Sequence, residues 1–317
     1  MKILITGVHG FVGSNLLNYL SKENTIYGLD IIAPEKTGLV ATYTWDDLDS
    51  GAIPSVDAII HLAGKAHDTK NEAAAEVYFK VNRDLTIKIF DYYRSHNIQK
   101  FIFFSTAKAA ADRVDGILSE DVIPLPVGPY GESKIAAENY ILGQVRAEPS
   151  LFCSRRVYIL RPCMIHGPGN KGNLNLLYSV VSKGFPWPLG SFENRRSFTS
   201  VDNICYVVKS LLVQPVESGI YNMCDDEPVS TNELIQVICS VLGTKARIWH
   251  LPKSFMSFCA KIGGCLHLPL NPERLRKLTE NYIASNDKIK CALGLKKMPV
   301  RSQDGLKKTI ESFVKAG

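Results

Sequence analysis

Thr6-Gly7-Val8-His9-Gly10-Phe11-Val12-Gly13 follows directly on the apolar run Lys2-Ile3-Leu4-Ile5, a pattern that predicts a β-strand, a tight glycine turn and a helix. A helix N-terminus carries free backbone N–H groups and partial positive charge, so a pyrophosphate can bind there if no side chain blocks its approach. Gly7 and Gly10 remove that obstruction, and Gly13 lets the helix lie close to the strand. Because the GxxGxxG spacing is wider than the common GxGxxG, a turn without a ligand is the alternative.

A second apolar run, Thr25-Ile26-Tyr27-Gly28-Leu29, ends at Asp30, 17 residues beyond Gly13. A carboxylate at the end of this strand can accept hydrogen bonds from the adenosine ribose hydroxyls and would repel a 2′-phosphate. The following Ile31-Ile32-Ala33-Pro34 supplies no arginine for such a phosphate. The sequence therefore favours NAD over NADP, with a simple turn-forming aspartate as the alternative.

The composition is that of an ordinary globular protein, because 45% of the 317 residues are hydrophobic and 21% are charged. This length allows one large domain or two joined domains with a substantial core. The net charge of +6 comes from scattered Lys and Arg. We therefore expect a small anionic substrate and no nucleic-acid partner.

The eight cysteines all lie between residues 153 and 291, without a CxxC pair, and no histidine stands at metal-ligand spacing. We expect free thiols of a reducing compartment and no metal site. The chain begins directly with a strand pattern, and no segment reaches the ~18 apolar residues that span a bilayer. These features predict a cytoplasmic protein without membrane insertion. The most membrane-like segment, Phe255 to Ile262, is short and is predicted to be a core helix.

Strand-like runs alternate with helical patterns through the first half of the chain, which predicts an α/β fold with a doubly wound parallel sheet of the Rossmann type. Beyond Arg161, proline and glycine punctuate shorter elements. We assign residues 1–165 to a dinucleotide-binding domain that is completed by about 197–215. Residues 166–196 and 216–317 are assigned to a smaller, C-terminal, substrate-binding α+β domain.

Tyr130 and Lys134 are four residues apart in Tyr130-Gly131-Glu132-Ser133-Lys134, so on a helix they share one face. A free phenol has a pKa of about 10, and a nearby ammonium favours the phenolate and lowers that pKa. Tyr130 is therefore a candidate for proton transfer. Ser105 and Thr106 end a predicted central strand, where a hydroxyl can bond the same substrate oxygen. The alternative is a surface Tyr–Lys pair.

Together these motifs resemble the extended short-chain dehydrogenase/reductase family. Within it, they resemble the nucleotide-sugar epimerases of the UDP-glucose 4-epimerase type and the related 4-ketoreductases. The resemblance covers nearly the whole chain. Its motifs appear in family order as TGVHGFVG, Asp30, HLAGKAH, FIFFST, PYGESK, LRPCMIHGPG, RRSFTSVDN and YNMCDDEPVSTNEL. It implies NAD as cofactor, a UDP-sugar or other nucleotide sugar as substrate, and a homodimer formed through the helices at Asn82 to Ser95 and Tyr130 to Val145.

The resemblance also implies roles for individual residues. Tyr130 becomes the catalytic acid/base, Lys134 its tuning partner and Thr106 the catalytic hydroxyl, with Ser105 as its neighbour. The residues implied at the dinucleotide are Gly7, Gly10, Phe11, Val12, Gly13, Asp30, Leu62, Ala63, Gly64, Lys65, Asn82, Tyr130, Lys134, Pro162 and Cys163, with Asp46 or Asp47 at the adenine.

The residues implied at the sugar nucleotide are Lys65, Thr106, Lys108, Asn173, Arg196 and one of Arg274, Arg276 and Lys277. Arg196 suits a diphosphate because a guanidinium binds phosphate in a forked geometry. Arg195 is the neighbour with which it is most easily confused.

The implied reaction is the 4-epimerisation of a UDP-hexose or UDP-N-acetylhexosamine through a transient 4-keto intermediate. An NAD(P)H-dependent 4-ketoreductase of a UDP-4-keto-6-deoxy-hexosamine is the alternative, and the motifs resemble a bacterial subgroup of polysaccharide biosynthesis. A 4,6-dehydratase is disfavoured because Ala107-Lys108-Ala109 replaces the Asp-Glu pair that would eliminate water. A non-catalytic NAD(H)-binding scaffold or sensor is a hypothesis of another class.

Overall fold

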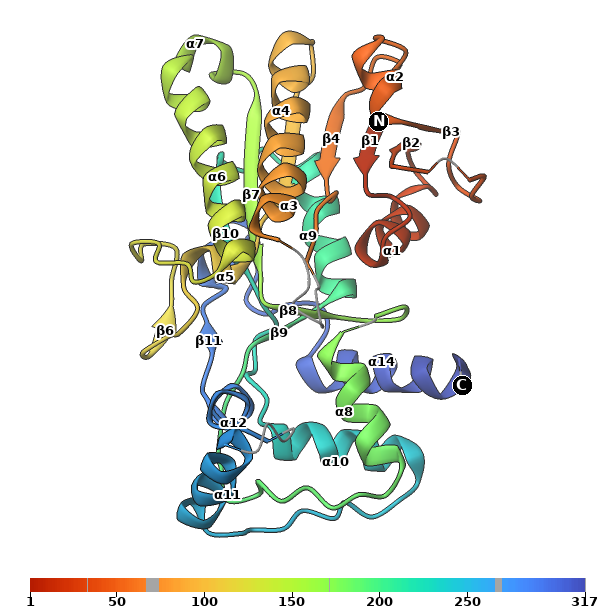
Figure 1. The fold of residues 1–317 in the computed structure, drawn as a ribbon. Helices are drawn as coiled ribbons and strands as arrows, with labels where there is room; N and C mark the ends of the chain where they lie inside the picture. Colours follow the sequence, from red (N-terminus) through yellow and green to blue (C-terminus); the bar gives the residue numbers. More distant parts are fainter. Residues whose placement is uncertain (33, 67–73, 171, 266–269, 317) are drawn as a thin grey trace.

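The computed structural model describes residues 1–32, 34–66, 74–170, 172–265 and 270–316. Its centre is a seven-stranded sheet in the order β10-β7-β5-β4-β1-β2-β3, in which every neighbouring pair is parallel (Figure 1). These strands are β1 Lys2–Thr6, β2 Thr25–Leu29, β3 Ala41–Tyr43, β4 Ala58–His61, β5 Lys100–Phe104, β7 Arg156–Pro162 and β10 Gly219–Met223. The predicted doubly wound parallel sheet is confirmed.

The sheet is covered on both faces because its strands are apolar on both sides. In β1, Ile3 and Ile5 belong to one buried cluster and Leu4 to another, as the two-residue period of a strand requires. Helices α1 (Phe11–Leu20) and α9 (Val201–Val213) contribute to the first cluster. Helices α4 (Leu85–Ser95) and α6 (Pro129–Ala147) contribute to the second.

A second group of helices lies below the sheet in Figure 1. Helices α8 (Asn173–Ser182), α10 (Thr231–Leu242) and α14 (Ser302–Ala316) enclose one core, and α11 (Lys253–Cys265) and α12 (Pro272–Thr279) enclose another. The remaining elements are α2 Trp45–Asp49, α3 Ala75–Tyr78, the π-helix η1 Phe79–Asp84, α5 Ala107–Ala110, β6 Ile117–Leu118, α7 Pro149–Phe152, β8 Met164–His166, β9 Phe198–Ser200, β11 Ile283–Ala284 and α13 Asp287–Leu293.

The strand order fixes where a ligand can bind. It reverses between β1 and β4, and the carboxyl ends of both strands point toward the lower group of helices (Figure 1). A crevice at such a reversal is the usual ligand site of an open parallel sheet. Over the described ranges, no helix combines the length and hydropathy that crossing a bilayer requires.

Helix α9 packs on the sheet within residues 197–215, the segment expected to complete the dinucleotide-binding domain, and the edge strand β10 follows that segment. One expectation differs from the structure. The segment from Phe255 to Ile262 forms a helix, but it is not a core helix. Phe255, Phe258 and Ile262 are exposed, because only one side of α11 packs against the protein. The division into two functional domains stays a prediction.

Candidate active site

The glycine turn between β1 and α1 has the shape of an anion site. Gly7 has a φ of +67°, and a Cβ there would lie 2.9 Å from the backbone nitrogen of Ala63. A Cβ on Gly13 would lie 2.7 Å from Cα of Val8, so this glycine lets α1 pack against the turn. Gly10 is the N-cap of α1, where no side chain bonds the free N–H groups and no acidic residue stands in the first turn. Phe11 and Val12, which open α1, complete this predicted set. The N-terminus of α1 can therefore bind a phosphate.

Asp30 lies beside this turn, directly after β2. Its carboxylate accepts hydrogen bonds from the backbone N–H of His9 at 3.1 Å and of Ile31 at 2.9 Å. Each oxygen keeps a lone pair that can accept a ribose hydroxyl. Lys36, which no sequence motif singles out, also reaches this turn. Its ammonium donates to the Val8 carbonyl at 3.3 Å and to the Ser14 hydroxyl at 2.5 Å. Burial lowers the pKa of Lys36, and the charge of Asp30 opposes that shift.

The two aspartates expected near the adenine occupy the short helix α2. The Asp47 carboxylate accepts from the backbone N–H of Thr44 at 2.7 Å and from its hydroxyl at 2.8 Å, which forms a capping box. Asp46 is exposed on the same helix. The structure gives Asp47 a local capping role, and contact of either residue with an adenine stays a prediction.

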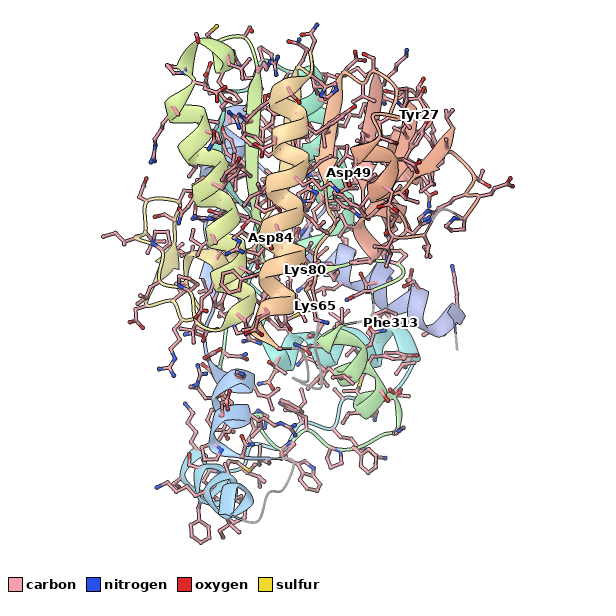
Figure 2. All side chains as sticks on the ribbon, turned by 45° about the horizontal axis from the view of Figure 1, so that its top comes forward. Tyr27, Asp49, Lys65, Lys80, Asp84 and Phe313 are labelled. Carbon is pink, nitrogen blue, oxygen red and sulfur yellow. The ribbon has the colours of Figure 1, made fainter. Side chains whose placement is uncertain are left out.

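The loop after β4 is tied to α6 by Asn82 of the π-helix. The Asn82 side chain accepts from the Lys65 backbone N–H at 2.8 Å and donates to the Lys65 carbonyl at 3.1 Å and to the Ser133 hydroxyl at 3.0 Å. Gly64 packs so closely that a Cβ there would lie 3.1 Å from Nζ of Lys134. Figure 2 shows Lys65 at the end of the sheet that faces the lower helices. Ala63, Gly64, Lys65, Asn82 and Lys134 are thus brought together.

Thr6 and His61 fix the base of that loop. The Thr6 hydroxyl oxygen accepts from the backbone N–H of Leu62 at 3.1 Å and of Ala63 at 3.0 Å. The buried His61 ring bridges Thr6 at 2.7 Å and Thr86 at 2.9 Å. Burial and then the charge of Lys134 hold the pKa of His61 well below its usual range, so the ring is neutral at physiological pH.

Tyr130 lies in the first turn of α6 and is hydrogen-bonded to Thr106, which follows β5. Burial raises the pKa of Tyr130, a side-chain hydrogen bond with Thr106 lowers it, and the Tyr78 ring, edge-on at 6.4 Å, adds to the rise. Lys134 does not lower this pKa as the sequence analysis expected. Its ammonium instead donates to the Phe104 carbonyl at 2.8 Å. Burial brings the pKa of Lys134 down to about 8, against the opposing charge of Glu138.

The Ser105 hydroxyl bonds a residue other than Tyr130. Its hydroxyl donates to the Glu138 carboxylate, which also accepts from Nη2 of Arg161 at 2.6 Å and from its Nε at 3.1 Å. Arg161 and Glu138 are both buried. Thr106 is the hydroxyl that bonds the tyrosine, while Ser105 bonds Glu138, and a catalytic role for either residue stays a prediction. The sequence analysis missed this ion pair, although Glu138 repeats the four-residue spacing of Tyr130 and Lys134.

Pro162 and Cys163 lie at the carboxyl end of β7. The Cys163 backbone N–H, directly after β7, donates to the carbonyl of Met223, the last residue of β10, at 3.0 Å. The Cys163 and Cys224 thiols are hydrogen-bonded, and this contact raises the pKa of Cys224. Both side chains are buried, so they pack beneath the active-site edge of the sheet.

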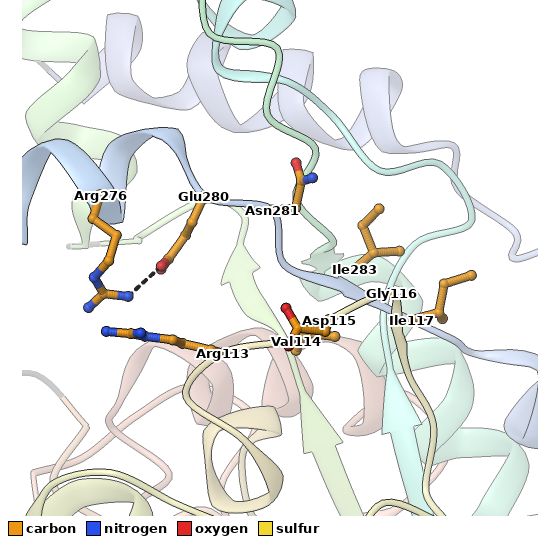
Figure 3. A pocket seen from close by; sticks show the side chains of 9 residues that line it. All are labelled: Arg113, Val114, Asp115, Gly116, Ile117, Arg276, Glu280, Asn281 and Ile283. Atoms are coloured by element: carbon orange, nitrogen blue, oxygen red, sulfur yellow. Dashed lines mark hydrogen bonds and ion pairs between the residues drawn. The ribbon is translucent and has the colours of Figure 1, made fainter. Parts of the chain in front are cut away.

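Two arginines from distant parts of the chain meet at one carboxylate. Glu280 accepts from Arg276 at 2.6 Å and from Arg196 at 3.4 Å. Arg276 and Glu280 line an open pocket of about 510 Å³ together with the segment from Arg113 to Ile117 (Figure 3). Neither Tyr130 nor Thr106 lines this pocket. Burial lowers the pKa of Arg196, and the charge of Glu280 opposes the shift.

Asp112 connects this end of the site with the tyrosine. Lys108, two residues after Thr106, makes an ion pair with Asp112 at 2.7 Å. Burial alone would raise the pKa of Asp112, but the contact with Lys108 and the charges of Arg276 and Lys277 lower it on balance. The segment from Thr106 to Asp112 therefore runs from the phenol toward α12.

The other basic residues predicted at the sugar nucleotide do not meet Arg196 and Arg276 at Glu280. Lys277 pairs with Glu273 at 2.7 Å on the exposed side of α12, and Arg274 is exposed in its first turn. Arg195 is half-exposed and pairs with Glu233 at 3.2 Å. Asn173 is the exposed first residue of α8, on another element, and its contact with a ligand stays a prediction. Of the three candidates near residue 275, Arg276 is the one that joins Arg196.

Comparison with known proteins gives a consistent result. Residues 3–224 match the family model "NAD dependent epimerase/dehydratase family". UDP-glucose 4-epimerase of Vibrio cholerae is 27% identical over 99% of this chain and 96% of that protein. GDP-6-deoxy-D-talose 4-dehydrogenase of Aggregatibacter actinomycetemcomitans is 28% identical over 76% of this chain and 80% of that protein. The crystal structure of UDP-glucuronic acid 4-epimerase from Bacillus cereus with NAD has the same fold, with a TM-score of 0.76 and 21% identity over 100% and 99% of the two chains.

Proposed function

The chain belongs to the NAD-dependent epimerase/dehydratase family and is an NAD-dependent enzyme of the extended short-chain dehydrogenase/reductase type, and on this premise we propose that it is a nucleotide-sugar 4-epimerase. The proposed substrate is a UDP-hexose or UDP-N-acetylhexosamine that passes through a transient 4-keto form. The observation that carries the proposal is Tyr130, hydrogen-bonded to Thr106 and one helical turn from Lys134, at the edge of the sheet that carries the glycine turn.

The described residues fit a dinucleotide. The uncapped start of α1 at Gly10 suits the pyrophosphate, and Asp30 suits a ribose diol. Gly64, Lys65 and Lys134 lie on the way from there to Tyr130. When bound, the nicotinamide would accept a hydride from the sugar and return it, and its positive oxidised ring would favour the phenolate.

Tyr130 acts on the proton of the sugar C4 hydroxyl. In the forward half-reaction the phenolate takes this proton, and in the reverse half-reaction the phenol returns it to the keto oxygen. Thr106 holds the same oxygen with its hydroxyl and lowers the pKa of Tyr130. Lys134 places a cation beneath Gly64, where it also suits the nicotinamide ribose.

Arg196 and Arg276 are proposed to hold the diphosphate of the sugar nucleotide. In this structure the Glu280 carboxylate occupies the point where the two guanidiniums converge, and a phosphate oxygen has the same charge and hydrogen-bonding capacity. Figure 3 shows Arg276 and Glu280 at the wall of the adjoining pocket, which is roomy enough for part of a nucleotide.

Arg276→Ala should raise KM for the sugar nucleotide by roughly tenfold or more with a smaller change in kcat, because a charge-assisted hydrogen bond contributes about 1.5–3 kcal/mol. Lys277→Ala is the matched control, since Lys277 pairs with Glu273 on the exposed side of the same helix. Steady-state kinetics of both variants makes the comparison. Equal KM values for the two variants would remove Arg276 from the substrate site.

The proposed function is tested by incubating purified enzyme with UDP-glucose or UDP-N-acetylglucosamine without added cofactor. Formation of the corresponding galacto epimer is expected, because the returned hydride regenerates NAD. The similarity to a 4-dehydrogenase favours a second candidate, a 4-ketoreductase. That enzyme would form no epimer and would consume added NADH or NADPH with a UDP-4-keto-6-deoxy-hexosamine.

We also infer that the enzyme is a homodimer. Helices α4 and α6 pack side by side on one face of the sheet, so each copy can supply two helices to a four-helix contact (Figure 1). Light scattering after gel filtration should give twice the chain mass, and the mass of one chain would contradict this assembly.

A further inference from the structure

Helix α11 carries apolar side chains on two sides. Met256 and Ala260 are buried in a core with Leu189 and Leu275. Phe255, Phe258 and Ile262 follow the i, i+3, i+7 spacing of one helical stripe and are 51%, 60% and 41% exposed. Two exposed phenylalanines on one stripe are unusual for a surface that faces only water.

Two neighbouring segments add exposed aromatic side chains at this end of the molecule. Residues 187 and 189 bridge to residues 248 and 250, and Leu189 packs under α11. Phe185 and Trp249, which belong to these segments, are 61% and 55% exposed. We call α11 together with these two segments the α11 end; Phe255, Phe258 and Ile262 form its stripe, and Phe185 and Trp249 are exposed on the two segments. Figure 1 shows α11 at the opposite end of the molecule from the N-terminus.

The charges around the α11 end are mostly positive. Residues 164–192 and 234–272 contain no aspartate or glutamate, and the exposed Glu193 and Glu273 follow directly on these stretches. The same stretches carry exposed cations at Lys183, Lys245, Arg247, Lys253 and Lys261. The Nζ of Lys253 lies over the Phe192 ring, 5.7 Å from its centroid. The proposed diphosphate site uses Arg196 and Arg276 and so leaves these cations unexplained.

We propose that the α11 end docks on the surface of an anionic lipid bilayer. Phenylalanine and tryptophan rings enter the boundary between headgroups and acyl chains, while lysines beside them meet anionic headgroups. With 13 residues α11 lies in the plane of the interface rather than across the bilayer. A second copy is a poor occupant, because two surfaces with an excess of cations repel each other.

Co-sedimentation with lipid vesicles tests the proposal. The full chain should partition onto phosphatidylglycerol/phosphatidylcholine vesicles and much less onto pure phosphatidylcholine, and raising salt from ~0.1 M to ~0.5 M should weaken binding. The double variant Phe255→Ser, Phe258→Ser should lower the partition at least roughly tenfold. The matched control is Ile123→Ser, Leu125→Ser, which removes exposed apolar side chains from another surface and should leave the partition unchanged.

Three results would overturn the proposal. The first is wild-type protein that binds neither vesicle, and the second is equal vesicle binding by both double variants. The third is a smaller assembly mass for the Phe255→Ser, Phe258→Ser variant in light scattering, which would make the α11 end a contact between copies. Unchanged thermal unfolding and NAD binding confirm that the variants are folded. Epimerase activity on soluble UDP-sugars does not depend on this surface, so failure here leaves the proposed function untouched.

Discussion

At the scale of single residues, burial and the Thr106 hydroxyl have opposite effects on the pKa of Tyr130. Burial raises its pKa, and the hydrogen bond with Thr106 lowers it. A phenol must lose its proton before it can accept one from a sugar, so activity rises with pH up to the pKa of Tyr130. Thr106 therefore extends the activity toward neutral pH.

Thr106→Ala should move the rising limb of kcat/KM to higher pH, because the pKa of Tyr130 loses the contact that lowers it. At neutral pH the rate should fall roughly tenfold or more, since a hydrogen bond to a charged group contributes about 1.5–3 kcal/mol. A pH profile of kcat/KM measures both effects. Ser105→Ala is the control, because its hydroxyl serves Glu138. If kcat/KM of Thr106→Ala rises over the same pH range as that of wild type, Thr106 does not lower the pKa of Tyr130.

At the scale of elements, α6 presents Tyr130, Lys134 and Glu138 along one face. Glu138 anchors this face, because its buried carboxylate binds the equally buried Arg161 of β7. The anchor joins the helix that carries the phenol to the strand that ends at Pro162.

Glu138→Gln should destabilise the fold by about 3–5 kcal/mol, because it leaves the Arg161 cation buried without a counter-charge. Lys108→Ala, which breaks the partly exposed pair with Asp112, should cost under about 1 kcal/mol. Urea unfolding of both variants gives the two values. If both variants lose a similar free energy of unfolding, the buried Glu138–Arg161 pair contributes no more to stability than a surface ion pair.

The start of α1 is a second element with a sharp steric requirement. Gly13→Ala should destabilise the protein by roughly 1–3 kcal/mol and weaken NAD binding, because its methyl group meets the backbone of Gly7 and Val8. Gly143→Ala on the exposed side of α6 has open space and should stabilise by about 0.5–1 kcal/mol. Thermal unfolding measures the stability of both variants, and NAD titration measures their affinity for the cofactor. A tolerated Gly13→Ala would contradict the close packing of α1 on the turn.

At the scale of the whole molecule, local patterns predicted the parallel sheet well. The alternating strand and helix patterns of the first half gave β1, β2, β4, β5 and β7, because each is a short apolar run. The four-residue spacing of Tyr130 and Lys134 predicted a shared helix face, which α6 provides.

The features that were missed depend on contacts between distant parts of the chain. Lys36 returns to the glycine turn across a loop. The choice of Arg276 among the three candidates near residue 275 depends on Glu280, which joins it to Arg196. The Glu138–Arg161 pair links a helix to a strand, and neither residue alone signals burial. Exposure of Phe255 and Phe258 follows from packing on one side of α11, which an apolar run does not reveal.

The central claim is that one phenol and one bound dinucleotide exchange a proton and a hydride with C4 of a sugar nucleotide. The most direct measurement compares wild type with Tyr130→Phe, each loaded with NAD, by following epimer formation from UDP-glucose or UDP-N-acetylglucosamine. We expect wild type to turn over without added cofactor, and Tyr130→Phe to bind NAD and sugar nucleotide equally well while forming at least about 100-fold less product. Turnover by Tyr130→Phe at the wild-type rate would contradict the claim.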